Sequence, residues 1–329
     1  MSEKKHYESG SIVSICVFIA SIFASVLFST ILKYVEKNQY TNYIVSMMLQ
    51  ITMFLALLIC HFLMARKVID VASYKKTLSI KEIVLVLVIL VLVYGLFFPI
   101  SSLWEFVLLK TGYNFELASG NNYLGTNNLG LMFFGLFTAG IIAPFVEESI
   151  FRVSIGYAYK DYGYFRGALL SALVFGLFHG GPAQFVFQFG LGLVACLVYY
   201  ITKSFWSSFM MHSCSNGFLI ILLYVKQNKN SESTNTEIEL LQSLSNKDIV
   251  MYLFIAVISF ILLINAIYLL VRVSNKRQNK EVRNLRDTLV EAVNVSQKMI
   301  LKEQWLLIIS VLLLLIPWVL NFVLGYVRK

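Results

Sequence analysis

The chain has 329 residues, of which 58% are hydrophobic and only 14% charged, and its net charge is +9. Soluble domains carry about 25% charged residues, so this composition excludes a large soluble core and indicates a protein that crosses a membrane several times. The positive charge could suggest nucleic acid binding. The Lys and Arg residues lie between the apolar runs, however, and we therefore expect no nucleic acid partner.

Nine apolar runs have about the length needed to cross a hydrocarbon core of about 30 Å. The fifth run is short for a complete crossing, so the number of spans is eight or nine. We therefore predict an all-α polytopic membrane protein, a bundle of about 8–9 transmembrane helices. The runs cover residues 12–32, 43–65, 83–103, 129–146, 167–179, 185–202, 205–225, 249–271 and 304–327.

The basic residues predict an orientation. Most of the 27 Lys and Arg residues lie in segments that are internal if the N-terminus is internal. Because internal loops carry an excess of basic residues, we expect a multi-pass protein of the cell membrane with a cytoplasmic N-terminus and the lipid bilayer around it. The first run is too long for a signal-peptide core, and we interpret it as a retained span.

The chain divides into three segments. We expect residues 1–114 to form N-terminal transmembrane helices, residues 115–226 to form the functional core, and residues 227–329 to add C-terminal helices with a basic cytoplasmic segment. Residues 227–247 are rich in Ser, Asn and Thr, which is typical of a flexible external loop. Residues 274–303 are basic with apolar residues at helical spacing, which predicts a cytoplasmic surface helix, although a solvated connector is the alternative.

The first polar motif, APFVEESIFR, occupies residues 143–152 at the end of the fourth run. Pro144 is expected to break the helix, and a restarted helix would place both glutamates in its first turn, where the dipole favours negative charge. Glu148 and Arg152 are four residues apart and can pair, whereas Glu147 has no such partner on its own helix. Glu147 is therefore a candidate general base, and a juxtamembrane ion pair beside a solvated glutamate is the alternative.

Two further motifs follow. In FGLFHGGP, residues 175–182, Phe175 and His179 are one helical turn apart, and the alternative role for His179 is structural, at a helix C-terminus. In SSFMMHSCSNGF, residues 207–218, His212 and Asn216 lie on one polar stripe of an apolar helix. Such a stripe can also serve only for hydrogen bonds between helices.

These residues are nearly all the strongly polar groups of four successive helical segments, and their inward faces can meet at one buried point. A carboxylate with an imidazole can hold and deprotonate a water molecule, and a second imidazole with an amide can stabilise an oxyanion. Together they suffice to hydrolyse an amide. The sequence has no HExxH motif of zinc proteases and no GxSxG motif of serine hydrolases. It also has no Gly-rich loop that would bind a phosphate.

The sequence EESIFR resembles the EExxxR motif of the CAAX protease and bacteriocin-processing family, also called the Abi family, which includes the type II CAAX prenyl endopeptidases. FGLFH is similar to the family's FxxxH motif and HSCSN to its HxxxN motif, and the resemblance covers about residues 125–226. It implies an intramembrane glutamate-type protease. It also implies that Glu147 and His179 activate the water and that His212 and Asn216 stabilise the oxyanion.

The resemblance implies supporting roles as well. Glu148 and Arg152 would support the first motif, and Phe175 would pack beside His179. Members of the family have been described both as metalloproteases and as metal-free glutamate proteases. The residues favour a metal-free site without a cofactor, but zinc bound by Glu147, His179 and His212 stays open.

The expected substrate is a membrane-associated peptide or protein in a bacterial cytoplasmic membrane, with a bacteriocin or signalling-peptide precursor favoured over a prenylated tail. One alternative is a non-enzymatic membrane partner, a regulator or bacteriocin-immunity protein that binds a kinase, a cell-wall enzyme or a peptide. Another is a transporter in which Glu147 and the histidines relay protons. The absence of repeats with paired broken helices argues against the transporter.

Overall fold

The computed structural model describes residues 6–34, 38–64, 68–115, 128–228, 241, 243–278 and 304–327. Within these ranges every regular element is a helix, and eight helices are long and apolar enough to cross a membrane. The predicted all-α polytopic bundle is thereby confirmed. The fifth predicted run corresponds to a shorter apolar helix, Tyr164–Phe178.

The helices follow one another along the chain and are joined by short connections where these are described. Within the described residues, the π-helical and 3-10 segments all lie in the stretch that carries the first motif. The elements are α1 (His6–Ile31), α2 (Gln39–Leu63), α3 (Val71–Tyr74), α4 (Ile80–Lys110), α6 (Leu129–Phe137), η2 (Thr138–Ile142), α7 (Ala143–Ile150), η3 (Phe151–Gly156), α8 (Tyr157–Tyr159), η4 (Lys160–Tyr162), α9 (Tyr164–Phe178), α10 (Phe185–Thr202), α11 (Phe205–Asn228), α13 (Asn246–Arg277) and α15 (Trp305–Val327).

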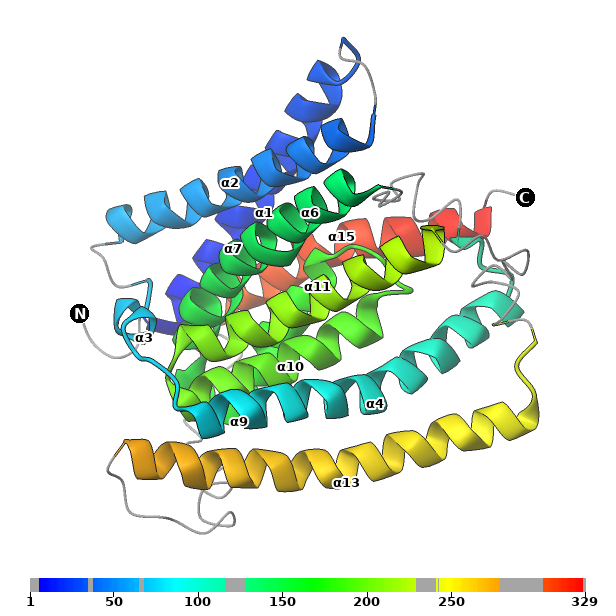
Figure 1. Cartoon of the computed structure of the whole chain (residues 1–329). Helices are drawn as coiled ribbons and strands as arrows, with labels where there is room; N and C mark the ends of the chain where they lie inside the picture. The colour runs from blue at the N-terminus through cyan, green and yellow to red at the C-terminus, as the bar shows by residue number, and fades with distance from the viewer. Residues whose placement is uncertain are drawn as a thin grey trace.

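The helices pack against one another in a bundle (Figure 1). The α1–α2 hairpin, in blue, forms one edge, and the α4–α13 pair, in cyan and yellow, forms the other. The helices α7, α10 and α11 lie between these edges, and α15 packs against α1 and α9. Helices from all three predicted segments of the chain therefore pack against one another, and the segment boundaries themselves stay a prediction.

The stretch Leu129–Tyr162 runs as one continuous helical span. The expectation that Pro144 breaks the helix and that a new first turn holds the glutamates is wrong. The π-helical turn η2 precedes the proline, and Ala143 donates its N–H to the carbonyl of Thr138 five residues back. Because the wider turn accommodates a residue without an N–H, the helix continues, and no helix N-terminus lies at the glutamates.

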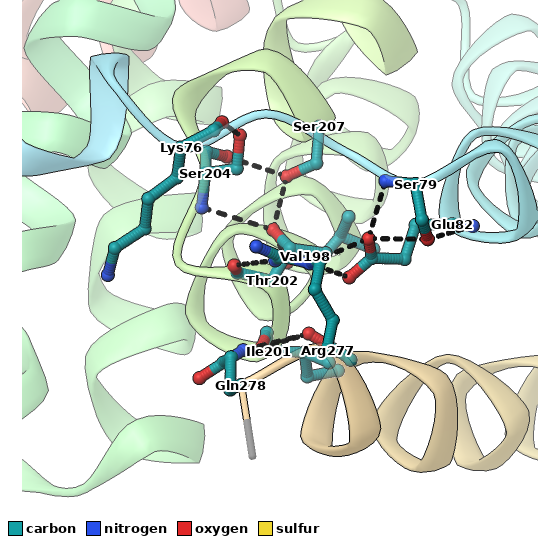
Figure 2. Close-up of polar contacts among 11 residues, drawn as sticks. Lys76, Ser79, Glu82, Val198, Ile201, Thr202, Ser204, Ser207, Arg277 and Gln278 are labelled. Carbon is teal, nitrogen blue, oxygen red and sulfur yellow. Dashed lines mark hydrogen bonds and ion pairs between the residues drawn. The ribbon is translucent and has the colours of Figure 1, made fainter.

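A polar clamp joins α4, α10 and α13 at one end of the bundle (Figure 2). Ser79 and Glu82 form a capping box at the start of α4. The fully buried Glu82 also accepts a hydrogen bond from Nε of Arg277 at 2.8 Å. The Nη2 atom of Arg277 donates to the carbonyl of Thr202 at 2.6 Å, where α10 ends. The clamp therefore fixes the end of α13 to the central helices.

The two polar segments predicted near the C-terminal spans fall mainly outside the described residues. The described part of the loop 227–247 consists of the last residues of α11, the first residues of α13 and a few residues before α13. Residues 274–277 belong to α13 and are not part of a separate surface helix. The predicted cytoplasmic helix beyond them lies outside the described residues.

Candidate active site

The first motif lies in α7, directly after the π-helical turn η2. Since Pro144 has no N–H, the carbonyl of Gly140 lacks its usual helical partner. The hydroxyl of Ser213 in α11 donates to this carbonyl. One turn along α11, Nδ2 of Asn216 donates to the carbonyl of Ala139 at 2.9 Å. These two bonds fasten α11 to the widened turn just ahead of the glutamates.

Glu148 and Arg152 form the predicted ion pair, and both side chains are fully buried. The Oε2 atom of Glu148 lies 3.0 Å from Nε of Arg152. The other carboxyl oxygen, Oε1, lies 2.9 Å from Nδ1 of His212. The guanidinium also covers the ring of Phe175, 4.4 Å from its centroid. Glu148 therefore both neutralises a buried cation and orients an imidazole from another helix.

Both histidines use Nδ1 to hold the ring in place. His179 ends α9, and its Nδ1 lies 2.9 Å from the carbonyl oxygen of Phe175. A carbonyl can only accept, so this Nδ1 carries the hydrogen. By the same reasoning Nδ1 of His212 donates to the ionised carboxylate of Glu148. In the neutral rings both Nε2 atoms are therefore hydrogen-bond acceptors.

The Nε2 atoms of the two histidines converge on one oxygen of Glu147. The Oε2 atom of Glu147 lies 3.9 Å from Nε2 of His179 and 3.8 Å from Nε2 of His212. These separations are too long for direct hydrogen bonds. Three acceptor atoms at this spacing are suited to bind one small donor, such as a water molecule, or a cation. We call Glu147, His179 and His212 the cluster. Its residues come from α7, from the end of α9 and from α11.

Phe175 packs against the rings of both histidines and is completely buried. Its ring centroid lies 4.6 Å from that of His179 and 5.7 Å from that of His212. Helix α10 can approach this ring because position 192 is a glycine. A Cβ added to Gly192 would lie 2.9 Å from the Phe175 ring. Phe175 thus packs beside His179, as the family resemblance implies.

The loop that follows His179 is held by helices from outside the motif-bearing segment. Gly180 adopts a φ of +63°, which a glycine adopts without strain. Its carbonyl accepts a hydrogen bond of 2.7 Å from Nδ2 of Asn321 in α15. The carbonyl of Pro182 accepts one of 2.8 Å from the indole of Trp104 in α4. Both bonds restrict the position of His179.

Gln50 in α2 is a site residue that the motif-based reading missed. Its Nε2 atom donates to Oε1 of Glu147 at 2.8 Å. Glu147 thus has a partner on another helix and is largely buried, which argues against the alternative of a solvated glutamate. A signal was present, because Gln50 is the one amide within the apolar stretch 43–63.

Tyr74, at the end of α3, also contacts the first motif. Its hydroxyl donates to Oγ of Ser149 at 2.7 Å, and Ser149 in turn donates to the carbonyl of Phe145 at 2.7 Å. Burial raises the pKa of Tyr74 to about 12, so its hydroxyl stays neutral and able to donate. The segment before α4 is thereby tied to α7.

The structure therefore brings three of the four predicted catalytic side chains to one point, and the three supporting side chains surround them. Asn216 differs, because its amide binds a backbone carbonyl one turn away from His212. The converging residues are Glu147, His179 and His212, and the surrounding ones are Glu148, Arg152 and Phe175.

The cluster can be tested for its fit to zinc. Two imidazoles and one carboxylate are a donor set that zinc accepts, with bonds of about 2.0–2.2 Å, which places neighbouring ligand atoms about 3.4 Å apart. The observed separations of 3.8 and 3.9 Å are wider. Among the residues that the structure describes, no group of three or more His, Cys, Asp or Glu residues is arranged to hold a metal ion. A metal-free site stays a prediction.

The fold and the cluster together define a polytopic membrane protein that holds a carboxylate and two imidazoles at one buried point. Residues 129–218 match the sequence model of the family described as type II CAAX prenyl endopeptidase Rce1-like. This match contains all three motifs and confirms the resemblance to the CAAX protease family.

Similarity to a protein named as a membrane peptidase supports the same resemblance. The chain is 25% identical over 107 residues to a protein of Bacillus subtilis (strain 168) named "Putative membrane peptidase YdiL". The match covers 32% of this chain and 44% of the relative, so it spans less than half of the relative's length. No solved structure matches the chain significantly.

Proposed function

We propose that the chain is an intramembrane endopeptidase of the glutamate type, which hydrolyses a peptide bond in a membrane-associated peptide or protein. One observation carries the proposal. A single carboxyl oxygen of Glu147 faces the Nε2 atoms of His179 and His212, at 3.9 and 3.8 Å, and both Nδ1 atoms are already bound elsewhere. This geometry supports the binding of one water molecule by groups that can remove its proton.

Glu147 acts as the general base in this proposal. It accepts a proton from the bound water while the water oxygen attacks the carbonyl carbon of the substrate, which forms a tetrahedral intermediate. Nε2 of His179 accepts the second hydrogen of the water and orients the attack. The protonated carboxyl of Glu147 then gives its proton to the amide nitrogen, the C–N bond breaks, and a carboxylic acid and an amine leave, with Glu147 returned to its ionised form.

His212 and Asn216 stabilise the oxyanion of the intermediate. The Glu148 carboxylate at Nδ1 orients the His212 ring, and in the doubly protonated ring the N–H at Nε2 donates a hydrogen bond to the oxyanion. Asn216 has a second amide hydrogen besides the one that binds Ala139, and it can donate that hydrogen. Arg152 keeps Glu148 ionised for this purpose.

The setting proposed is the cytoplasmic membrane of a bacterium, with the N-terminus in the cytoplasm and the site open toward the cytoplasmic half. The substrate proposed is a peptide precursor anchored at the membrane, and no metal is required. Stringent chelation of the purified protein during a cleavage assay tests this last point. Activity that persists supports the metal-free mechanism, and activity that is lost and returns with zinc contradicts it.

The proposed function is tested with the full chain in phospholipid vesicles. The probe is a mixed library of peptides that carry a palmitoyl or farnesyl anchor, and mass spectrometry locates the cuts. Wild type is compared with Glu147→Gln, His179→Ala and the control Asn265→Leu. Asn265 is an exposed residue of α13 whose amide binds only the Ile261 carbonyl of its own helix among the contacts described.

We expect cleavage by wild type and by Asn265→Leu and its loss in the other two variants. Cleavage that survives in both Glu147→Gln and His179→Ala would contradict the mechanism. A wild type that cuts no anchored peptide, but whose Glu147→Gln variant keeps the full cellular phenotype, would favour a non-enzymatic membrane partner. Proton-coupled uptake lost in both variants would favour a transporter.

A further inference from the structure

Gln50 contacts the proposed base from outside the region that defines the family. It lies in α2, well before residues 129–218, and only 8% of it is exposed. Its side-chain amide donates a 2.8 Å hydrogen bond to Oε1 of Glu147. Among the described residues, this is the one hydrogen bond that the Glu147 carboxylate accepts.

The bond selects which oxygen of Glu147 faces the histidines. The terminal torsion of a glutamate is broad and roughly twofold, so an unbound carboxylate would rotate freely. Because Gln50 holds Oε1, the other oxygen, Oε2, is directed at His179 and His212. A carboxylate that is fixed before the substrate arrives needs no reorganisation during the reaction.

Helix packing does not explain a glutamine at this position. The Oε1 atom of Gln50 is buried and has no hydrogen-bond partner among the described residues. A half-satisfied buried amide is unfavourable for folding. The apolar contact between α2 and α7 is already made by residues such as Met53 and Leu57, which pack in one cluster with Val146 and Ile150. A leucine would complete this contact better than Gln50 does.

We infer that Gln50 is a positioning residue for the reaction, acting through Glu147. This inference rests on the proposed function, since it assigns a role relative to the proposed base. The ionisable groups that face Glu147 are His179 from the end of α9 and His212 from α11, and Glu148 lies beside it on α7. Gln50 is the neutral donor that completes the set from α2.

The test uses the vesicle assay with one cleaved peptide from the library as the probe. In Gln50→Leu we expect kcat to fall about 10- to 100-fold, the range of one hydrogen bond to a charged group, while KM stays within about twofold. Thr52→Val is the matched control on the same helix, because the Thr52 hydroxyl donates only to the carbonyl of Met48 among the contacts described. It should behave as wild type.

Gln50→Glu separates positioning from packing. The introduced carboxyl has the shape of the amide but donates to Glu147 only when it carries a proton. We therefore expect the pH optimum of Gln50→Glu to lie below that of wild type, with activity recovered toward acid pH. Gln50→Leu should show no such recovery. Equal profiles for the two variants would overturn the inference.

A second measurement tests the contact without any substrate. Thermal unfolding of Gln50→Leu, Glu147→Leu and the double variant should give midpoint shifts that do not add. Additive shifts overturn the inference whatever the assay shows. If Glu147→Gln cleaves at the rate of wild type, the proposed role of Glu147 as the base fails. If Glu147→Gln is inactive while Gln50→Leu keeps the kcat of wild type, the proposed function stands and the inference alone fails.

Discussion

The Oε1 atom of Glu148 lies 2.9 Å from Nδ1 of His212, so the first and third sequence motifs meet through one buried contact. The same carboxylate holds Arg152 through its other oxygen. This residue thus connects two helices and neutralises a cation. A change at Glu148 should therefore affect both folding and catalysis.

We predict that Glu148→Ala lowers the free energy of unfolding by about 3–5 kcal/mol, because it leaves the buried Arg152 charge without a counterion. Thermal unfolding in detergent measures this loss, and cleavage should disappear with it. The double variant Glu148→Leu with Arg152→Met removes both charges and should recover much of the stability without the activity. A stable and active Glu148→Ala would rule out this role.

Glu147→Gln, unlike Glu148→Ala, should lose activity while it keeps the stability of wild type. The amide has nearly the same shape as the carboxylate, and its oxygen can still accept the hydrogen bond from Gln50, so the unfolding midpoint should stay near that of wild type. Loss of general base catalysis should lower kcat by about 10² to 10⁴. Rates at saturating peptide provide the measurement. A variant with normal turnover would show that another group removes the proton.

Asn321→Leu tests the support of the loop behind His179 by α15. The change removes the donor to the Gly180 carbonyl, so the loop should loosen and kcat should fall, while stability decreases by only about 1 kcal/mol. Asn265→Leu provides the matched control, because it removes an asparagine bond made within one helix. Equal activity in the two variants would show that α15 does not position His179.

Arg277→Met tests the clamp between α4, α10 and α13. Glu82 is fully buried, and the change leaves its charge without the guanidinium, so we expect a loss of about 3 kcal/mol in the free energy of unfolding. Activity at low temperature should be kept, because the clamp does not touch the cluster at Glu147. The double variant Arg277→Met with Glu82→Gln should be more stable than Arg277→Met alone. A lower stability of the double variant would speak against a charge effect.

Contacts within one helix could be predicted from the sequence. Glu148 and Arg152 are four residues apart, as are Phe175 and His179, and both pairs are in contact. The gathering of Glu147 with the histidines could also be anticipated, because an apolar bundle has few places for ionisable groups. These predictions needed only helical geometry and the scarcity of polar residues.

Contacts that depend on how the helices are placed against each other could not be predicted. The bonds from Gln50 and Asn321 join residues far apart in the sequence, and no spacing rule predicts them. The prediction that Pro144 breaks the helix is wrong for a related reason. A proline breaks a helix only when its missing bond is not compensated, and here Ser213 from α11 and a wider turn compensate it.

Hydrogen bonds from helices outside residues 129–218 limit whether this region can work when it is moved into another protein. Gln50, Trp104 and Asn321 all lie outside residues 129–218, yet each bonds to a residue of that region. A chimaera that grafts this region onto foreign helices would preserve every motif letter and still lose these three anchors. In another chain, the three motifs alone therefore predict activity less well than the motifs together with residues that make these three hydrogen bonds.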